Sequence, residues 1–147
     1  MNVKTEVEQQ LENWKQAVIS QNVENIMPFY AEDIRAFDAI AELQFTGRNQ
    51  YKAHWQRCLQ TCKMTHFEIG QIDIKVDGEL AVCFFLNQCG GIDEKTGEEQ
   101  VGWVRGTQVY QKNHGKWLII HEHFSLPFDM ATGSALFQLT PETESAW

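Results

Sequence analysis

Apolar residues recur at steps of three and four along the first part of the chain. Between residues 5 and 20 they are Val7, Leu11, Trp14, Ala17 and Val18. This spacing predicts an amphipathic helix, and Thr5 with Glu8 fits a capping box at its start. A second, short helix is expected over residues 23–30, with Pro28 near its first turn or at a kink. A third is expected over residues 49–62.

The second half of the chain alternates apolar and polar residues, as strands do. Strands are expected over residues 34–45, 64–76, 79–89 and 101–112, and from residue 116 onward. Asp77-Gly78 is the strongest hairpin signal among them. Helices followed by antiparallel strands predict an α+β fold. We expect a long curved antiparallel sheet that wraps over three N-terminal helices as a cone with an interior pocket.

The last long apolar stretch is KWLIIHEHFSLPFD, at Lys116–Asp129. It begins with β-branched and aromatic residues and is stopped by Pro127, which predicts a strand. Successive side chains of a strand alternate between its two faces. One face is therefore expected to hold Trp117, Ile119, His121, His123 and Ser125, starting as core and ending as the wall of a pocket.

The register of this strand depends on the turn Asn113-His114-Gly115. A three-residue turn with a left-handed glycine gives the cross-strand pairs Lys112–Lys116, Thr107–His121 and Arg105–His123. A two-residue turn would instead pair Gly106 with His123 and separate this group. We adopt the first register, which places an arginine, a hydroxyl and two imidazoles on the concave face. Such a group suits an anionic or carbonyl-bearing ligand.

Structural roles for the same residues stay open. Arg105 could pair with Glu122 or Asp38, and the two histidines could belong to the core or to an interface. A metal site at His121-x-His123 lacks a visible third ligand. We therefore expect no metal in the protein.

Charge and composition narrow the possible partners. The chain has 147 residues, with 12 basic against 20 acidic side chains and a formal net charge of −8. This balance argues against binding to nucleic acid or to an anionic membrane. No run is long and apolar enough to span a bilayer, and the N-terminus has no apolar signal core. A cytoplasmic location and a single domain over residues 1–147 are expected, with about 128–147 as a tail that packs on the domain or on a partner.

The four cysteines are Cys58, Cys62, Cys83 and Cys89. Free thiols are expected in a cytoplasmic chain. His54, Cys58 and Cys62 share one helix face at steps of four residues, which could hold a metal, but a fourth ligand is not in sight. Packing of this helix face on the sheet is the simpler interpretation.

Four segments resemble the SnoaL-like and ketosteroid-isomerase-like branch of the nuclear transport factor 2-like superfamily. They are FYAEDIRAFD (Phe29–Asp38), FTGRNQYKAHW (Phe45–Trp55), WVRGTQVYQKNHGKWLIIHEHFSLPFD (Trp103–Asp129) and ATGSA (Ala131–Ala135). The stretch HGKWLIIHEHFS also resembles the end of the association domain of calcium/calmodulin-dependent kinase II, from the same superfamily. The resemblance covers nearly the whole chain and implies the cone-shaped fold. The superfamily includes isomerases, cyclases, dehydratases, transport adaptors and oligomerisation hubs, so the fold does not decide the function.

The resemblance points to Asp38 as a candidate base. In ketosteroid isomerases an aspartate at the matching place, shortly after a turn that FYAEDI resembles, moves a proton alpha to a carbonyl. A carboxylate at a strand end beside Phe37 could be desolvated enough for this role. A structural aspartate paired with Arg35, Arg48 or Arg105 is an equal alternative.

The chain departs from the isomerases at their oxyanion hole, which uses a tyrosine on the first helix and a protonated aspartate on a later strand. Trp14 occupies the approximate place of that tyrosine, and Thr107 or Gln108 that of the aspartate. An enolate here would need stabilising by Tyr30, His123 or Arg105. Steroid isomerisation is therefore not expected.

We predict a small-molecule enzyme of the isomerase, cyclase or hydratase type, which uses acid/base chemistry without a cofactor on a carbonyl-containing ligand in an apolar pocket. The predicted catalytic residues are Asp38, His123 and Arg105. The predicted ligand-binding residues are Trp14, Tyr30, Trp55, Trp103, Thr107 and His121. A homodimer through the outer face of the sheet is expected. The alternative is a non-catalytic module that binds a ligand or drives oligomerisation.

Overall fold

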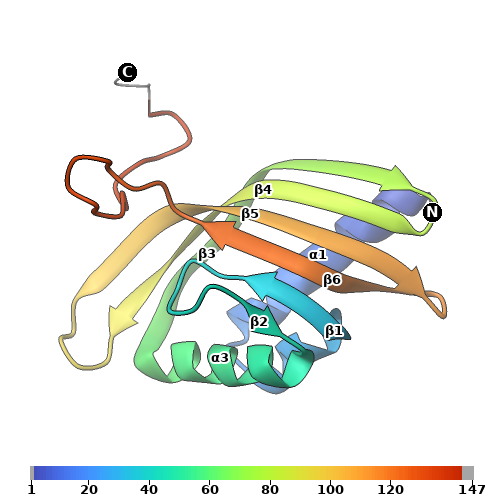
Figure 1. Cartoon of the computed structure of the whole chain (residues 1–147), viewed down its shortest axis with the longest axis horizontal. Coiled ribbons are helices and arrows are strands. Elements are labelled where there is room, and N and C mark those ends of the chain that lie inside the picture. Colours follow the sequence, from blue (N-terminus) through green and yellow to red (C-terminus); the bar gives the residue numbers. More distant parts are fainter. Residues whose placement is uncertain (1, 144–147) are drawn as a thin grey trace.

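The computed structural model describes residues 2–143 and confirms the predicted α+β fold (Figure 1). The helices are α1 (Val3–Ile19), α2 (Val23–Ile26), the short 3-10 helix η1 (Met27–Phe29) and α3 (Arg48–Thr61). The strands are β1 (Tyr30–Phe37), β2 (Phe45–Thr46), β3 (Cys62–Asp77), β4 (Leu80–Asp93), β5 (Glu99–Asn113) and β6 (Lys116–Ser125). The strands form one curved sheet, and α1 and α3 lie against its concave side.

The sheet has the order β2-β1-β6-β5-β4-β3. Its strands pair antiparallel except for β1 and β6, which run parallel. The sheet is therefore mixed, whereas the sequence predicted an antiparallel one. No hairpin joins β1 to β6, so a tight turn does not impose an antiparallel direction on this pair.

Both N-terminal helices begin at an asparagine. The side-chain oxygen of Asn2 accepts a hydrogen bond of 2.8 Å from the backbone N–H of Thr5, so α1 starts two residues earlier than predicted and the Thr5–Glu8 capping box is wrong. Asn22 caps α2 in the same way through the N–H of Glu24. Pro28 lies in the first turn of η1, where its missing N–H leaves no helical hydrogen bond unmade.

The predicted apolar face of α1 packs into the core. Trp14 is fully buried, with its ring stacked on Phe124 at 6.2 Å between centroids and edge-on to Phe67 at 5.6 Å. Gly106 on β5 makes room for the rings beneath it, because a β-carbon there would come within 2.5 Å of Phe85. Around Trp14, the interior of the cone is thus largely filled by aromatic side chains.

The segment after β6 leaves the sheet and folds back once (Figure 1). Phe128 forms an isolated bridge with Ala135, and Phe137 lies against the glycine backbone of Gly102 on β5. Of the predicted tail, residues 144–147 lie outside the described part of the chain. No helix within residues 2–143 is long and apolar enough to cross a membrane.

Candidate functional site

The turn between β5 and β6 determines where the predicted site residues lie. His114 and Gly115, both with positive φ, form a two-residue turn in which Asn113 pairs with Lys116. A bulge follows at Ile120, since Tyr110 pairs with Ile119 but Val109 pairs with His121. The predicted three-residue turn and its register are wrong.

The bulge moves His121 and His123 to the other face of the sheet from Trp117 and Ile119. Thr107 is opposite His123, and Arg105 is opposite Ser125. The four predicted residues therefore do share a face, but it is the outer, convex one. Glu122 takes the inward position instead and is fully buried.

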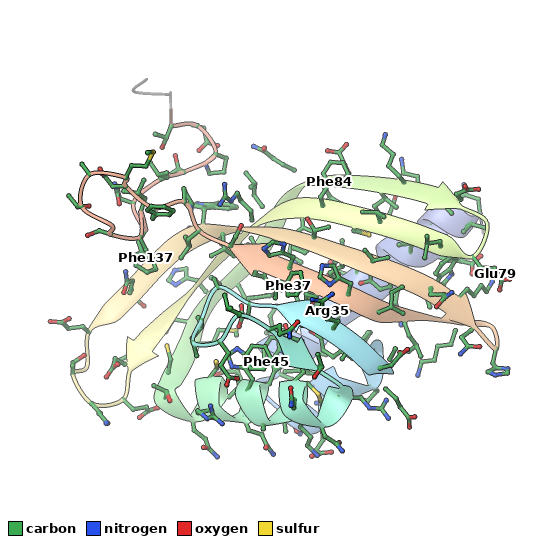
Figure 2. All side chains as sticks on the ribbon, in the orientation of Figure 1. Arg35, Phe37, Phe45, Glu79, Phe84 and Phe137 are labelled. Carbon is green, nitrogen blue, oxygen red and sulfur yellow. The ribbon has the colours of Figure 1, made fainter. Side chains whose placement is uncertain are left out.

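The outer face holds a polar and aromatic cluster that does not point at Asp38. The ring of Phe37 contacts the rings of both His121 and His123 edge-on, at 4.9 and 5.4 Å between centroids. Nδ1 of His121 lies 2.6 Å from the backbone oxygen of Arg35, to which it donates. Nε of Arg105 donates to the hydroxyl of Ser125 at 3.1 Å, so the alternative in which Arg105 pairs with Glu122 or Asp38 is wrong. Figure 2 shows Arg35, Phe37 and Phe84 along this face.

Glu122 lies at the centre of a buried hydrogen-bond network on the inner face. The hydroxyl of Tyr30 donates to both carboxylate oxygens, at 3.1 and 2.9 Å, and the hydroxyl of Tyr51 donates to Oε2. Nε2 of Gln108 donates to Oε1 at 2.6 Å. Each donor is buried as well. A buried carboxylate is tolerated when its oxygens are satisfied in this way.

Two further side chains fix the donors of this network. The indole Nε1 of Trp14 donates to the hydroxyl of Tyr30 at 2.9 Å, and the hydroxyl of Tyr110 donates to Oε1 of Gln108 at 2.8 Å. Tyr30 thereby uses its hydroxyl both as acceptor and as donor. The indole of Trp14 and the amide of Gln108 are therefore occupied within the protein.

Burial and hydrogen bonding act in opposite directions on Glu122. Its complete burial raises the pKa of the carboxyl and the donors from Tyr51, Gln108 and Tyr30 lower it, which together bring the pKa to about 7. Burial and the neighbouring Glu122 charge raise the pKa of Tyr30 and Tyr51 well above 10. Both phenols thus remain hydrogen-bond donors.

Asp38 and His54 form a second polar pair. Asp38 follows β1 directly and opens the exposed loop 39–44, and its Oδ2 meets Nε2 of His54 on α3. The second oxygen of Asp38 accepts the N–H of Ala39 at 2.8 Å. His54 is buried, whereas the side chain of Asp38 is 18% exposed and accessible from solvent. The alternative in which Asp38 pairs with an arginine is therefore wrong, since its partner is a histidine.

The environment of His54 favours its charged form. Burial lowers the pKa of the imidazole, but hydrogen bonds and charge interactions with Asp38 and Cys58 raise it more strongly, to about 9. Phe45 stacks on the ring at 4.2 Å between centroids. At neutral pH a carboxylate base and an imidazolium acid therefore lie side by side.

Helix α3 links this pair to the buried network. Tyr51 and His54 are three residues apart on one helix face, with their rings nearly parallel and 6.1 Å apart. Tyr51 donates to Glu122 while His54 bonds to Asp38. The hydrogen bond from Tyr51 to Glu122 on β6 thus fixes the position of α3, so that His54 contacts Asp38 at the end of β1.

Of the predicted site residues, the structure brings Asp38, Tyr30 and Trp14 to the inner side of the fold. Trp55 is half-buried beside Tyr51, and its indole Nε1 is buried without a hydrogen-bond partner in the described residues. Trp103, Thr107, Arg105, His121 and His123 lie on the outer face. Within residues 2–143 no group of three or more His, Cys, Asp or Glu side chains is arranged to hold a metal ion.

Sequence reasoning considered His54 only as a possible metal ligand, and it missed Tyr51 and Glu122 as members of a site. A signal for the first two existed, since Tyr51, His54 and Cys58 recur at steps of three and four and share a helix face. That pattern equally fits a helix packing on a sheet. Glu122 gave no usable signal, because simple alternation from Trp117 puts it on the solvent side.

Cys58 is expected to be the most reactive of the four thiols. Its Sγ lies 3.7 Å from Nε2 of His54. Burial raises the pKa of Cys62, of Cys83 to about 12 and of Cys89 to about 11, which leaves those thiols largely unreactive near neutral pH. Iodoacetamide should therefore modify Cys58 first, as measured by peptide mass spectrometry at successive times.

The His54→Gln variant provides the control for this reactivity. Without the imidazolium, alkylation of Cys58 should slow by about tenfold, while the other three thiols keep their rates. An unchanged rate at Cys58 would show that the histidine does not activate this thiol.

Comparison with known proteins agrees with this architecture. The family model of the SnoaL-like domain matches residues 7–129. A nuclear transport factor 2-like protein of unknown function from Pseudomonas putida KT2440 is 44% identical, with 94% of this chain and 96% of that chain covered and a TM-score of 0.85. No curated protein matches the chain.

Two more distant structures share the fold. A Xanthomonas campestris protein assigned as a calcium/calmodulin-dependent protein kinase II association domain is 24% identical over 91% of this chain and 88% of that chain, with a TM-score of 0.73. A ketosteroid isomerase-like protein from Erwinia carotovora atroseptica is 13% identical over 85% of this chain and 97% of that chain, with a TM-score of 0.74. The family match spans most of the chain, and the chain belongs to the SnoaL-like family of the nuclear transport factor 2-like superfamily.

Proposed function

We propose that this protein is a cofactor-free acid/base enzyme of the isomerase, cyclase or hydratase type that acts on a small carbonyl-containing compound. The observation that supports this most directly is the Asp38–His54 pair, in which a solvent-accessible carboxylate contacts a buried imidazole with a pKa of about 9. A base and a cationic acid at one position suit the removal and return of a proton next to a carbonyl.

In the proposed reaction, Asp38 removes a proton from the carbon alpha to the substrate carbonyl. The electron pair left on that carbon moves to the carbonyl oxygen, and the His54 imidazolium is the positive charge that stabilises the resulting enolate. Asp38 then returns its proton to the substrate at the same or a conjugated carbon. His54 thus takes the role that the sequence assigned to His123 and Arg105.

The buried network around Glu122 holds α3, the helix that carries His54, in place. Glu122 anchors Tyr51, and Tyr51 lies one helical turn before His54 on α3. A catalytic pair works best when packed neighbours fix its side chains. We therefore assign Tyr51 and Glu122 as positioning residues, and Trp55, with its unpaired buried N–H, as a candidate donor to a ligand oxygen.

The occupied donors argue against steroid isomerisation. Trp14 and Gln108 lie at the approximate places of the two isomerase oxyanion donors. The indole N–H of Trp14 donates to Tyr30, and the side-chain amide of Gln108 donates to Glu122. Neither is free to bind an enolate oxygen. The ketosteroid isomerase-like neighbour shares the fold of this chain, but the occupied donors do not fit that substrate.

We further propose a cytoplasmic homodimer that associates through the outer face of the sheet. The four cysteines are free, as expected in a reducing compartment. Phe84 and Leu80 are large apolar side chains exposed on β4, and Phe37 lies with the two histidines on the same face. Exposed apolar side chains of this kind mark association surfaces.

Exchange of α-protons for deuterium tests the proposed chemistry. The wild-type protein is incubated in D₂O with a panel of small ketones, β-diketones and α,β-unsaturated ketones, and loss of the α-proton signal is followed by ¹H NMR. Exchange faster than in buffer alone supports the acid/base enzyme. No exchange across the panel, together with stable assemblies larger than a tetramer in light scattering, would favour the non-catalytic oligomerisation module.

A further inference from the structure

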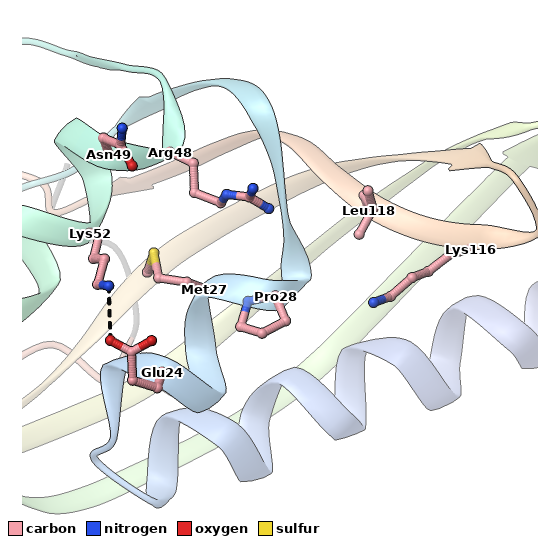
Figure 3. Close-up of a pocket in the computed structure, with 8 residues that line it drawn as sticks. All are labelled: Glu24, Met27, Pro28, Arg48, Asn49, Lys52, Lys116 and Leu118. Atoms are coloured by element: carbon pink, nitrogen blue, oxygen red, sulfur yellow. Dashed lines mark ion pairs between the residues drawn. The ribbon is translucent and has the colours of Figure 1, made fainter.

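A cavity opens beside the start of α3, and neither Asp38 nor His54 lines it (Figure 3). It measures about 440 Å³ and is lined by residues from α2 and η1, from the first two turns of α3 and from the start of β6. Its lining residues are Glu24, Met27, Pro28, Arg48, Asn49, Lys52, Lys116 and Leu118. Cavities of this size are in the range that small molecules occupy in proteins.

The charge of this cavity is opposite to that of the protein. Three of its lining residues are cations and one is an acid, in a chain with 12 basic and 20 acidic side chains. Lys52 pairs with Glu24 at 2.8 Å. Arg48 pairs with the largely exposed Glu32 at 3.3 Å and donates to the backbone oxygen of Tyr30 at 3.2 Å. Lys116 has no ion-pair partner among residues 2–143.

The beginning of α3 adds to the positive character of the cavity. Its first turn contains Arg48 and no acid, and its N-cap Gly47 offers no side-chain hydrogen bond. Helices usually place acidic groups there, because the N-terminal end of the helix dipole is positive. A cation in this place without a side-chain cap costs stability that a bound anion would restore.

The remaining wall of the cavity is apolar. Met27 is buried and Leu118 is half-buried, and the ring of Pro28 lies beside Met27 (Figure 3). A bare inorganic ion would leave this wall in contact with water. An anion with an apolar body could place its charge near Arg48 and Lys116 and its body on Met27 and Leu118.

We propose that this cavity is a binding site for a small organic anion, with a carboxylate or phosphate group held by Arg48 and Lys116 and an apolar body on Met27, Pro28 and Leu118. The site is separate from the Asp38–His54 pair. Its occupant can therefore be a second ligand of the protein, independent of any substrate.

Titration of the full ¹⁵N-labelled chain tests this site. The probes are benzoate, phenyl phosphate, inorganic phosphate and neutral benzamide, followed by amide shifts in ¹H–¹⁵N spectra up to about 20 mM. Saturable shifts at Arg48, Asn49, Lys52 and Lys116 with benzoate or phenyl phosphate support the proposal, and the tighter of the two identifies the charged group. Inorganic phosphate and benzamide should bind at least about tenfold more weakly, because phosphate has no apolar body and benzamide has no negative charge.

Matched charge reversals complete the test. Lys116→Glu should weaken binding of the better probe by about tenfold or more, whereas Lys75→Glu, an equal charge change at an exposed position on β3, should leave it within about twofold. Both positions are exposed, so both variants should fold. Equal weakening by the two variants, or the absence of saturable shifts at these residues with any probe, would overturn the proposal.

Discussion

Replacement of Asp38 by asparagine is expected to slow α-proton exchange by about 10²–10⁴-fold, the usual contribution of a positioned general base. Asparagine keeps the shape of the side chain and can still accept a hydrogen bond from His54, but it cannot take up a proton. The variant should remain folded, since Asp38 lies at the edge of the core with a partly exposed side chain. Exchange rates by ¹H NMR and unfolding by circular dichroism, measured on the same sample, separate the two effects.

Asp33→Asn is the matched control for this result. Asp33 belongs to the same strand, β1, but its side chain is exposed. Its replacement removes an equal charge and should leave exchange within about twofold of the wild type. If Asp38→Asn exchanged substrate as fast as Asp33→Asn, the base would have to be another group and the proposed mechanism would fail.

Replacement of Glu122 by alanine is expected to lower the free energy of unfolding by about 3–5 kcal/mol. The substitution leaves the hydroxyls of Tyr30 and Tyr51 and the amide of Gln108 buried without their shared acceptor, and each unmet buried donor costs about 1–3 kcal/mol. Urea unfolding monitored by fluorescence measures the loss. Glu68→Ala, at an exposed position on β3, should change stability by less than about 1 kcal/mol.

The loss on Glu122→Ala should also depend on pH. Burial raises the pKa of Glu122 from 4.5 to about 7 in the folded protein, so the folded state holds this proton more tightly than the unfolded state. The resulting stabilisation is complete below pH 4.5 and is lost as the pH rises through about 7. The stability difference between wild type and variant should therefore be larger at pH 4.5 than at pH 8. A constant difference over this range would show that Glu122 does not titrate there.

The helices and the fold class could be predicted from sequence because their signals are local. The residues of α1 that repeat at three and four positions are the ones that the core buries, and Asp77-Gly78 marks the turn between β3 and β4. Even here the ends of the helices differ from the prediction by one to three residues. Asn2, not Thr5, is the N-cap, because its side-chain oxygen accepts a hydrogen bond from a free backbone N–H in the first turn of the helix.

The face of the β6 side chains could not be predicted from alternation. One extra residue at Ile120 exchanges inside for outside over the rest of the strand, so that Glu122 enters the core while His121 and His123 leave it. Alternation carries no information on where a bulge falls. The place of the bulge is decided by tertiary packing, which puts Trp117, Ile119 and Glu122 on the same, buried side of the sheet.

An α+β fold with an apolar helix face and a run of long strands could be predicted from local patterns, and the family resemblance pointed to Asp38 as a candidate base. The partner of Asp38 depends on how the elements pack together. Asp38 and His54 lie 16 positions apart on different elements, and they touch because α3 docks on the end of β1 through Phe45 and Tyr51. Local patterns specify elements through short-range backbone preferences, whereas a site depends on packing between elements, which those preferences do not encode.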